Sequence, residues 1–245
     1  MEENCRVLAT DYRCSDIDTA CGYVTDNLYD LRGGYICFSN VHTTVMAYED
    51  PKYREILASA GIVFPDGSPI VNEMRKKGYK NAERIAGPDF MARMFELTKD
   101  KDIRHFFYGS KQETLDKLSA KLSERYRGIK IAGMYSPPFR ELTEEEDEET
   151  VRMINDARPD IVWVGLGAPK QEKWMNEHKG KINAVMAGVG AGFDFHAGTV
   201  KRAPLWMQKT SLEWLYRLIQ DPGRLFKRYM VTNSRFIYYT KIKKR

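Results

Sequence analysis

The sequence lacks any long apolar run. No stretch of about 18 or more apolar residues occurs in the 245-residue chain, so we predict no membrane-spanning helix. The first residues, Met1 to Asn4, include two acids and lack the apolar centre of a secretory signal. We therefore expect a cytoplasmic protein. Hydrophobic residues make up 42% of the chain, which is ordinary for a globular core.

Cysteine is scarce. The four cysteines, Cys5, Cys14, Cys21 and Cys37, lie in the first forty residues, with no C-x-x-C pair and no histidine at ligand spacing. A chain of this length in a reducing compartment needs no disulfides. We expect these side chains to behave as small apolar residues rather than as zinc ligands.

Charge is unevenly distributed along the chain. The net charge is +5, but residues 201–245 contain twelve Lys or Arg and only two acids, which leaves −5 for residues 1–200. Aromatic residues are interleaved with these cations. That pattern fits an interfacial membrane helix, a site for single-stranded nucleic acid, or arginines that fold back onto a diphosphate. We therefore treat residues 1–200 as a catalytic domain and residues 201–245 as a basic helical appendage.

Short apolar runs alternate with helix-like segments through the first 200 residues. Strands are predicted at 6–9, 35–38, 61–64, 105–108, 129–134, 161–164 and 184–187. Helices are predicted at 15–31, 43–60 with a break at Pro51, 88–97, 111–126, from Thr143, and from Lys170 or Gln171. This alternation predicts an α/β fold with a Rossmann-like parallel sheet covered by helices on both faces.

Ligands bind such sheets beyond the carboxyl ends of the strands. The predicted ends carry Gly109, Tyr135, the segment 165–170 and the segment 188–192. We expect Gly109 and Tyr135 to contribute to binding for this reason.

Asp66 follows a predicted strand and stands between Pro65 and Gly67. A carboxylate held in this turn can take the proton from a sugar hydroxyl. An Asp that only caps the turn fits the local sequence equally well.

The segment Gly165 to Glu172 is chemically richer. Its glycines allow close approach of the backbone to a ligand, and the following helix N-terminus favours an anion. Gly167, Lys170 and Gln171 are therefore candidate contacts to a diphosphate or a sugar.

The glycine cluster 188–192 resembles part of a dinucleotide fingerprint. The residues from Phe193 to Gly198 do not read as a helix opening, so an NAD site is not favoured. Asp194 and His196 remain candidates for the pocket wall, although each type is more often a hydrogen-bonded structural residue.

Two acidic segments have metal-like spacing. Asp16 and Asp18 form a D-x-D pattern near a predicted helix start, where Asp is usually a cap. The acidic run from Glu144 to Glu149 suits the first turn of a helix. We predict no metal ligand in either segment and no cofactor.

Several segments together resemble the WecG/TagA/CpsF family, glycosyltransferase family twenty-six. The resemblance runs in order from about residue 35 to the end. The matching stretches are Phe64 to Gly67, Arg84 to Asp89, Ser136 to Phe139, Gly165 to Glu172, Gly188 to Gly198 and Leu212 to Arg217.

The resemblance implies an inverting, metal-independent transferase that uses a UDP-sugar and an undecaprenyl-diphosphate-linked acceptor at the inner face of the bacterial membrane. Asp66 matches the family's proposed base. Asn40, Arg84 and Gln171 match pocket positions, and Arg217 and Arg224 match tail arginines thought to hold the diphosphate. An anionic membrane surface is then the partner of residues 201–245, nucleic acid is not expected, and a homo-oligomer is open.

One residue departs from the family pattern. Phe38 stands where the family often has a Thr that is thought to contact the sugar. N-acetylmannosamine is the family's best-known donor sugar, but glucose or another hexose stays open. The rival interpretations are an NAD-dependent oxidoreductase and a non-enzymatic module that binds membrane or RNA.

Overall fold

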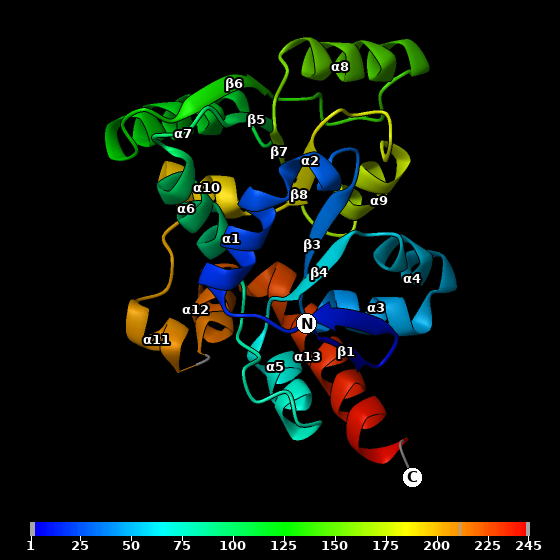
Figure 1. Ribbon diagram of the computed structural model, residues 1–245. Helices are drawn as coiled ribbons and strands as arrows, with labels where there is room; N and C mark the ends of the chain where they lie inside the picture. The colour runs from blue at the N-terminus through cyan, green and yellow to red at the C-terminus, as the bar shows by residue number, and fades with distance from the viewer. Residues whose placement is uncertain (1–2, 211, 244–245) are drawn as a thin grey trace.

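A six-stranded parallel sheet with the strand order β4-β3-β8-β7-β5-β6 organises the molecule (Figure 1). The computed structural model describes residues 3–210 and 212–243, without the side chains of Lys209 and Arg224. The strands are β1 (Asn4–Val7), β2 (Thr10–Arg13), β3 (Tyr35–Ser39), β4 (Ile62–Pro65), β5 (Arg104–Gly109), β6 (Lys130–Tyr135), β7 (Ile161–Gly165) and β8 (Val185–Gly188).

Helices follow most of the strands. They are α1 (Ile17–Asp26), α2 (Leu28–Leu31), α3 (Val41–Glu49), α4 (Pro51–Ala58), α5 (Ser68–Lys76), α6 (Gly87–Thr98), α7 (Gln112–Arg125), α8 (Glu144–Asp156), α9 (Lys170–Glu177), α10 (Gly192–Ala197), α11 (Leu205–Lys209), α12 (Glu213–Gln220) and α13 (Pro222–Ile237), which the π-helix η1 (Tyr238–Ile242) continues.

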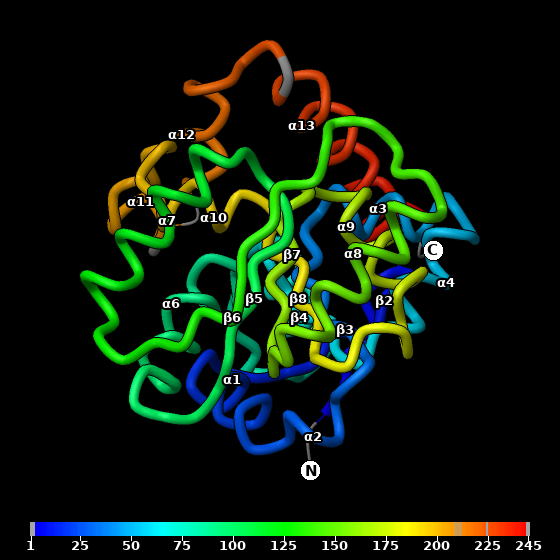
Figure 2. The backbone as a smooth tube through the Cα atoms, turned by 90° about the horizontal axis from the view of Figure 1, so that it is seen from above, coloured from blue at the N-terminus to red at the C-terminus, as the bar shows by residue number. Residues whose placement is uncertain are grey.

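Both faces of the sheet are covered, as predicted. Helices α1, α6, α7 and α10 lie on one face, and α3, α4 and α9 lie on the other (Figures 1 and 2). Side chains of β3 alternate between two cores: Tyr35 and Cys37 belong to one, and Ile36 and Phe38 belong to the other. This alternation follows from the two-residue period of a strand and explains why β3 reads as a continuous apolar run.

The basic tail lies across the carboxyl ends of the strands, where α12 and α13 appear at the top of Figure 2. Helix α13 and η1 pack on α3, with the rings of Tyr48 and Tyr239 centred 4.6 Å apart. Arg235 also pairs with Glu49 at 2.7 Å. The division at residue 200 stays a prediction.

Local capping chemistry agrees with the sequence in three places. Asp16 caps α1 by accepting a hydrogen bond from the Thr19 N–H at 2.8 Å. Thr143 and Glu146 form the predicted capping box of α8. The break at Pro51 separates α3 from α4, since proline suits the first turn of a new helix.

Several boundaries differ from the prediction. The strand expected at 6–9 is an antiparallel hairpin of β1 and β2. Leu8 adopts a left-handed φ of 55° in the turn of this hairpin, where Gly or Asn is the usual residue. The helix expected at 15–31 ends at Asp26, and α2 restarts at Leu28. Helix α5 was not predicted.

The expectation that no helix opens after the glycine cluster is wrong. Helix α10 begins at Gly192 and runs to Ala197. It is short, and no strand of the described chain follows it to form the second half of a dinucleotide-binding unit. The interpretation as an NAD site is therefore still disfavoured, on topology rather than on the missing helix.

Candidate functional site

Asp66 lies directly beyond β4, at the carboxyl ends of the strands, which the tail covers. Its N–H donates to the carbonyl of Ser39 at 2.9 Å, which extends the pairing of β3 and β4 by one residue. The N-cap of α5 is Gly67, and within the described chain the Asp66 carboxylate accepts no backbone hydrogen bond of that turn. The turn-capping interpretation is not supported by this geometry.

The nearest partner of the Asp66 carboxylate is Arg84. Arg84 Nη2 lies 3.4 Å from Asp66 Oδ1, and each side chain is 25% exposed. Burial raises the pKa of Asp66; the charges of Arg84 and Arg217 oppose this, and the charges of Glu213 and Asp89 reinforce it. A carboxyl group with a raised pKa is a stronger base than an ordinary Asp.

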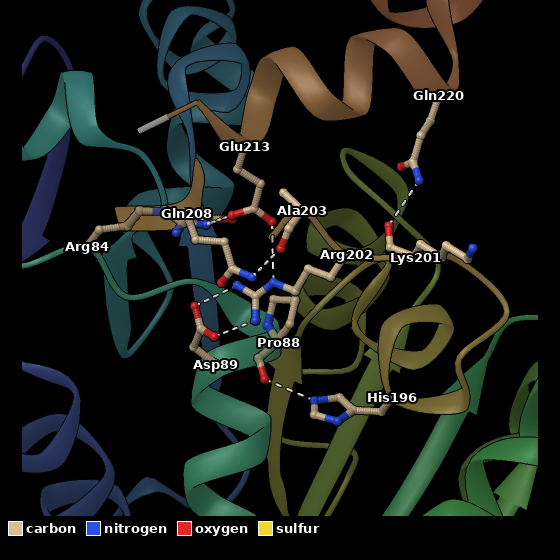
Figure 3. Close-up of polar contacts among 11 residues, drawn as sticks. Arg84, Pro88, Asp89, His196, Lys201, Arg202, Ala203, Gln208, Glu213 and Gln220 are labelled. Atoms are coloured by element: carbon tan, nitrogen blue, oxygen red, sulfur yellow. Dashed lines mark hydrogen bonds and ion pairs between the residues drawn. The ribbon is translucent and has the colours of Figure 1, made fainter. Parts of the chain in front are cut away.

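Arg84 belongs to a chain of ion pairs that joins the tail to the sheet (Figure 3). Its Nη2 lies 2.8 Å from Glu213 Oε2 on α12. Glu213 Oε1 lies 3.4 Å from Arg202 Nε, and the two terminal nitrogens of Arg202 contact both carboxylate oxygens of Asp89 at 2.5 and 2.7 Å. The carboxylates raise the pKa of Arg84 against the effect of burial, so this arginine is charged.

Arg217 is the second arginine of the tail that faces this site. Its guanidinium carbon lies 5.8 Å from the ring centre of Phe195 on α10, and its charge lowers the pKa of Asp66. Arg217 is thus placed to meet an anion near Asp66. Arg224 was predicted for the same role, but its side chain lies outside the described residues.

Asn40 stands at the end of β3, next to Asp66. Its side-chain oxygen accepts from the N–H groups of His42 and Thr43 and so caps α3. Beside it, His42 Nδ1 and Arg228 Nε are buried, and neither has a hydrogen-bond partner among the described residues. Two unsatisfied nitrogens at a strand end indicate space for a polar ligand or water.

The loop after β7 is tied to the loop after β8 by Gln171. Its amide oxygen accepts from the N–H groups of Gly167 and Gly190, and its amide nitrogen donates to the carbonyl of Gly188 and to Glu172. These four contacts use the amide's hydrogen-bonding capacity. Gln171 is only 4% exposed, so the structure assigns it to shaping the loops, and direct ligand contact stays a prediction.

Lys170 and Gly167 are more open to solvent. Lys170 is exposed at the first position of α9, directly after the cis Ala168–Pro169 peptide. Gly167 has a left-handed φ of 78°, with open space where a side chain would point. Both residues can therefore approach a ligand.

Gly109 and Tyr135 lie farther from Asp66. Gly109 has a φ of 120°, and a Cβ there would come within 2.7 Å of the Gly165 backbone, so glycine is required by packing. Tyr135 ends β6, the strand at the opposite edge from β4. Five strand spacings separate these edges, about 24 Å. The structure does not bring Tyr135 together with Asp66.

Asp194 and His196 sit on α10. Asp194 Oδ1 accepts from the Thr199 hydroxyl at 3.2 Å. His196 Nε2 donates to the Pro88 carbonyl at 2.9 Å, and burial lowers the pKa of its imidazole (Figure 3). Both have structural partners, and their part in binding stays a prediction.

Phe38 is buried in the core on the α6 side of the sheet. Its ring lies 5.1 Å from that of Phe90 and 5.8 Å from that of Phe64. Its side chain is 6% exposed and fills aromatic core volume. The departure from the family Thr therefore gives the strand an apolar side chain where a hydroxyl would otherwise stand.

The acidic segments hold no metal cluster within the described chain, where no group of three or more His, Cys, Asp or Glu has metal-binding geometry. Asp18 pairs with Arg93, and Glu146 pairs with Arg140. Within the described residues, no disulfide includes any of the four cysteines.

Sequence reasoning missed the residues that join the tail to the surroundings of Asp66. Asp89 and Glu213 stood inside the family-like stretches, but we predicted no role for them or for Arg202. One signal was present: Glu213 is one of only two acids in a segment with twelve cations. An acid retained against such a charge trend is a candidate for a specific ion pair.

Taken together, the fold and site define a Rossmann-like α/β protein with a carboxylate and arginines gathered at the strand ends, an arrangement suited to group transfer from an anionic donor. The model of the glycosyl transferase WecG/TagA/CpsF family matches residues 5–245. The chain belongs to this family, as the sequence predicted.

Curated relatives agree with this assignment. The chain is 35% identical over 216 residues to the N-acetylglucosaminyldiphosphoundecaprenol N-acetyl-beta-D-mannosaminyltransferase of Bacillus subtilis (strain 168), covering 87% of this chain and 82% of the relative. It is 29% identical over 192 residues to the protein of the same name from Staphylococcus aureus (strain MW2), covering 78% and 74%.

Proposed function

We propose that this protein transfers a hexose or N-acetylhexosamine, with N-acetylmannosamine as the leading choice, from a UDP-sugar to a polyprenyl-diphosphate-linked sugar in cell-wall or exopolysaccharide biosynthesis. The observation that carries the proposal is the raised pKa of the Asp66 carboxyl, which lies at the strand ends with Arg84 and Arg217 acting on it. The names of the relatives supply the acceptor and sugar class.

In the proposed reaction, Asp66 takes the proton of an acceptor hydroxyl. The hydroxyl oxygen forms a bond to the anomeric carbon of the donor, and the bond from that carbon to the UDP oxygen breaks, which inverts the anomeric centre. UDP leaves with the bonding electron pair. Arg217, with Arg224 and Lys170, stabilises the growing negative charge on the diphosphate.

The charge stabilisation proposed here uses no metal. A divalent cation is the usual alternative counter-charge for a leaving diphosphate, and the arginines of the tail take that role in this scheme. EDTA should therefore leave transfer unchanged. Loss of transfer in EDTA, with recovery on adding manganese, would refute this part of the proposal.

The proposed location is the inner face of the membrane, with the tail bound to anionic lipid. No helix in the described ranges is long and apolar enough to cross a bilayer. The tail instead presents exposed apolar side chains, including Leu205, Trp206, Ile219 and Phe226, alongside its cations. This combination is typical of helices that lie in the lipid interface.

The decisive experiment is Asp66→Asn, measured with UDP-N-acetylmannosamine and a lipid-linked N-acetylglucosamine diphosphate in vesicles. We expect transfer to fall by about 10²–10⁴, the usual contribution of a general base. Full activity in this variant would refute Asp66 as the base, and absence of transfer by the wild-type protein would overturn the proposed function.

Thermal unfolding supplies the control for folding. The pKa of Asp66 is raised in the folded state, so its contribution to stability is present below the unfolded pKa and lost as pH rises through the folded pKa. The ionised group is thus a destabilising charge at neutral pH. Asp66→Asn should keep or raise the melting temperature there while transfer is lost.

A further inference from the structure

Glu213 of the tail holds the arginine that faces the base. One nitrogen of Arg84, Nη2, faces both carboxylates, at 2.8 Å from Glu213 and 3.4 Å from Asp66. The Glu213 side chain is 12% exposed, against 25% for Asp66, so its contact with Arg84 is less screened by water. Glu213 is therefore the closer and more buried partner of the shared guanidinium.

Arg202 fixes Glu213 in this position. Asp89 contacts both terminal nitrogens of Arg202, and Glu213 contacts its Nε (Figure 3). A guanidinium with a carboxylate contact at each of its three nitrogens has little freedom to turn. Arg202 thus acts as a clamp between the first turn of α6 and the start of α12.

The charges around Asp66 are finely balanced. Asp66, Asp89 and Glu213 supply three carboxylates, whereas Arg84 and Arg202 supply two guanidinium groups. Arg217 adds a third positive charge that acts on Asp66. Because opposite charges favour the ionised form and like charges disfavour it, loss of the Glu213 charge would leave Arg84 with Asp66 as its nearest partner.

We propose that Glu213 is a positioning residue for the base: by binding Arg84 it prevents the guanidinium from closing onto Asp66, which keeps Asp66 basic when the tail is docked. The inference rests on the proposed function, in which Asp66 is the base. On this inference the basicity of Asp66 depends on a residue of the tail. When the tail is not docked, Asp66 is a weaker base and the tail arginines are absent from the site.

The test compares Glu213→Gln with wild type in full-length protein on the same vesicles. The amide keeps the size of the side chain but removes its charge. Arg84 then closes on Asp66 and lowers the pKa of that carboxyl. We expect the acidic limb of the kcat/KM profile to move to lower pH, and the plateau to fall about tenfold because a weaker base transfers the proton more slowly.

Two matched variants separate charge from structure. Glu213→Asp keeps the charge and should return the acidic limb toward that of wild type. Glu148→Gln makes the same chemical change at an exposed site on α8 and should leave the profile unchanged. Titration of the Asp66 carboxyl by carbon NMR, assigned by difference from Asp66→Asn, reports the base without relying on turnover.

The outcomes distinguish the inference from the function it rests on. If Asp66→Asn is inactive and Glu213→Gln shifts neither the limb nor the NMR titration, the role of Glu213 is refuted and the base assignment stands. If Asp66→Asn is fully active, the base assignment fails and the role of Glu213 fails with it; if the wild-type protein transfers no sugar, the proposed function fails. A downward shift of both readouts, reversed in Glu213→Asp, supports the positioning role.

Discussion

The body of the protein and its tail bury their apolar side chains to very different extents. The sheet carries two cores with fully buried aromatic residues such as Trp163, Phe95 and Phe107. In the described chain, ten of the fourteen exposed large hydrophobic side chains belong to residues 201–245. Burial of apolar side chains therefore stabilises the body, whereas the tail exposes apolar surface that a lipid bilayer or another protein can cover.

The attachment of the tail differs in kind from the packing of the body. Its contacts near Asp66 are ion pairs, Glu213 with Arg84 and Arg202 with Asp89, whereas α13 and η1 add ring packing on α3. Ion pairs are directional and sensitive to partner loss. This contrast predicts that changes in the core of the body alter stability and that changes in the tail alter activity.

The largest effect should come from the body. Phe95→Ala removes a fully buried ring that packs against His105, Phe107 and Trp163. We expect the free energy of unfolding to fall by about 3–5 kcal/mol. Denaturant unfolding measures this, and a loss below about 1 kcal/mol would contradict the picture of a tightly packed core.

Deleting residues after Ala203 should separate the two regions. The body keeps both cores apart from Phe236, which the tail contributes to one of them, so we expect it to unfold cooperatively. Transfer should nevertheless fall at least about 100-fold, because the deletion removes Arg217 and Glu213 from the surroundings of Asp66, the proposed base. Vesicle transfer assays and calorimetry test this together; an active deletion variant would show that the tail does not complete the site.

The apolar surface of the tail should matter for lipid binding alone. Trp206 and Ile219 are 60% and 70% exposed. Replacing both with Ser should weaken binding to anionic vesicles about tenfold and leave the melting temperature unchanged. The matched control is Tyr29→Ser, which removes an 84% exposed ring on α2 at the opposite end of the molecule (Figure 2). An equal loss of vesicle binding in this control would show that the tail has no special role in binding lipid.

The smallest effect concerns the far end of the tail. Arg235 is about half exposed and pairs with Glu49 at 2.7 Å. Exposed ion pairs contribute at most about 1 kcal/mol, so Arg235→Ala should change unfolding and transfer only slightly. A large loss of either would mean that this contact, rather than the Glu213 cluster, holds the tail.

Much of the architecture was readable from local pattern. The apolar run 161–164, the capping box at Thr143 and the proline at 51 each predict their element because the signal lies within a few residues. The hairpin of β1 and β2 was not predicted from the sequence, because its turn places a leucine at positive φ. Local sequence carries no marker for that choice, which is fixed by the packing of Cys5, Val7 and Tyr12 into the core.

By itself the sequence determined the α/β class, the family and the strand-end position of Asp66, since these depend on periodicity and on short motifs. Only the tertiary structure decided that Glu213, 147 positions after Asp66, shares an arginine with it. It also decided that Gln171 is fully engaged between two loops and that Tyr135 lies at the far edge of the sheet. Such relations follow from strand order and from the docking of the tail, which join residues that no local pattern connects.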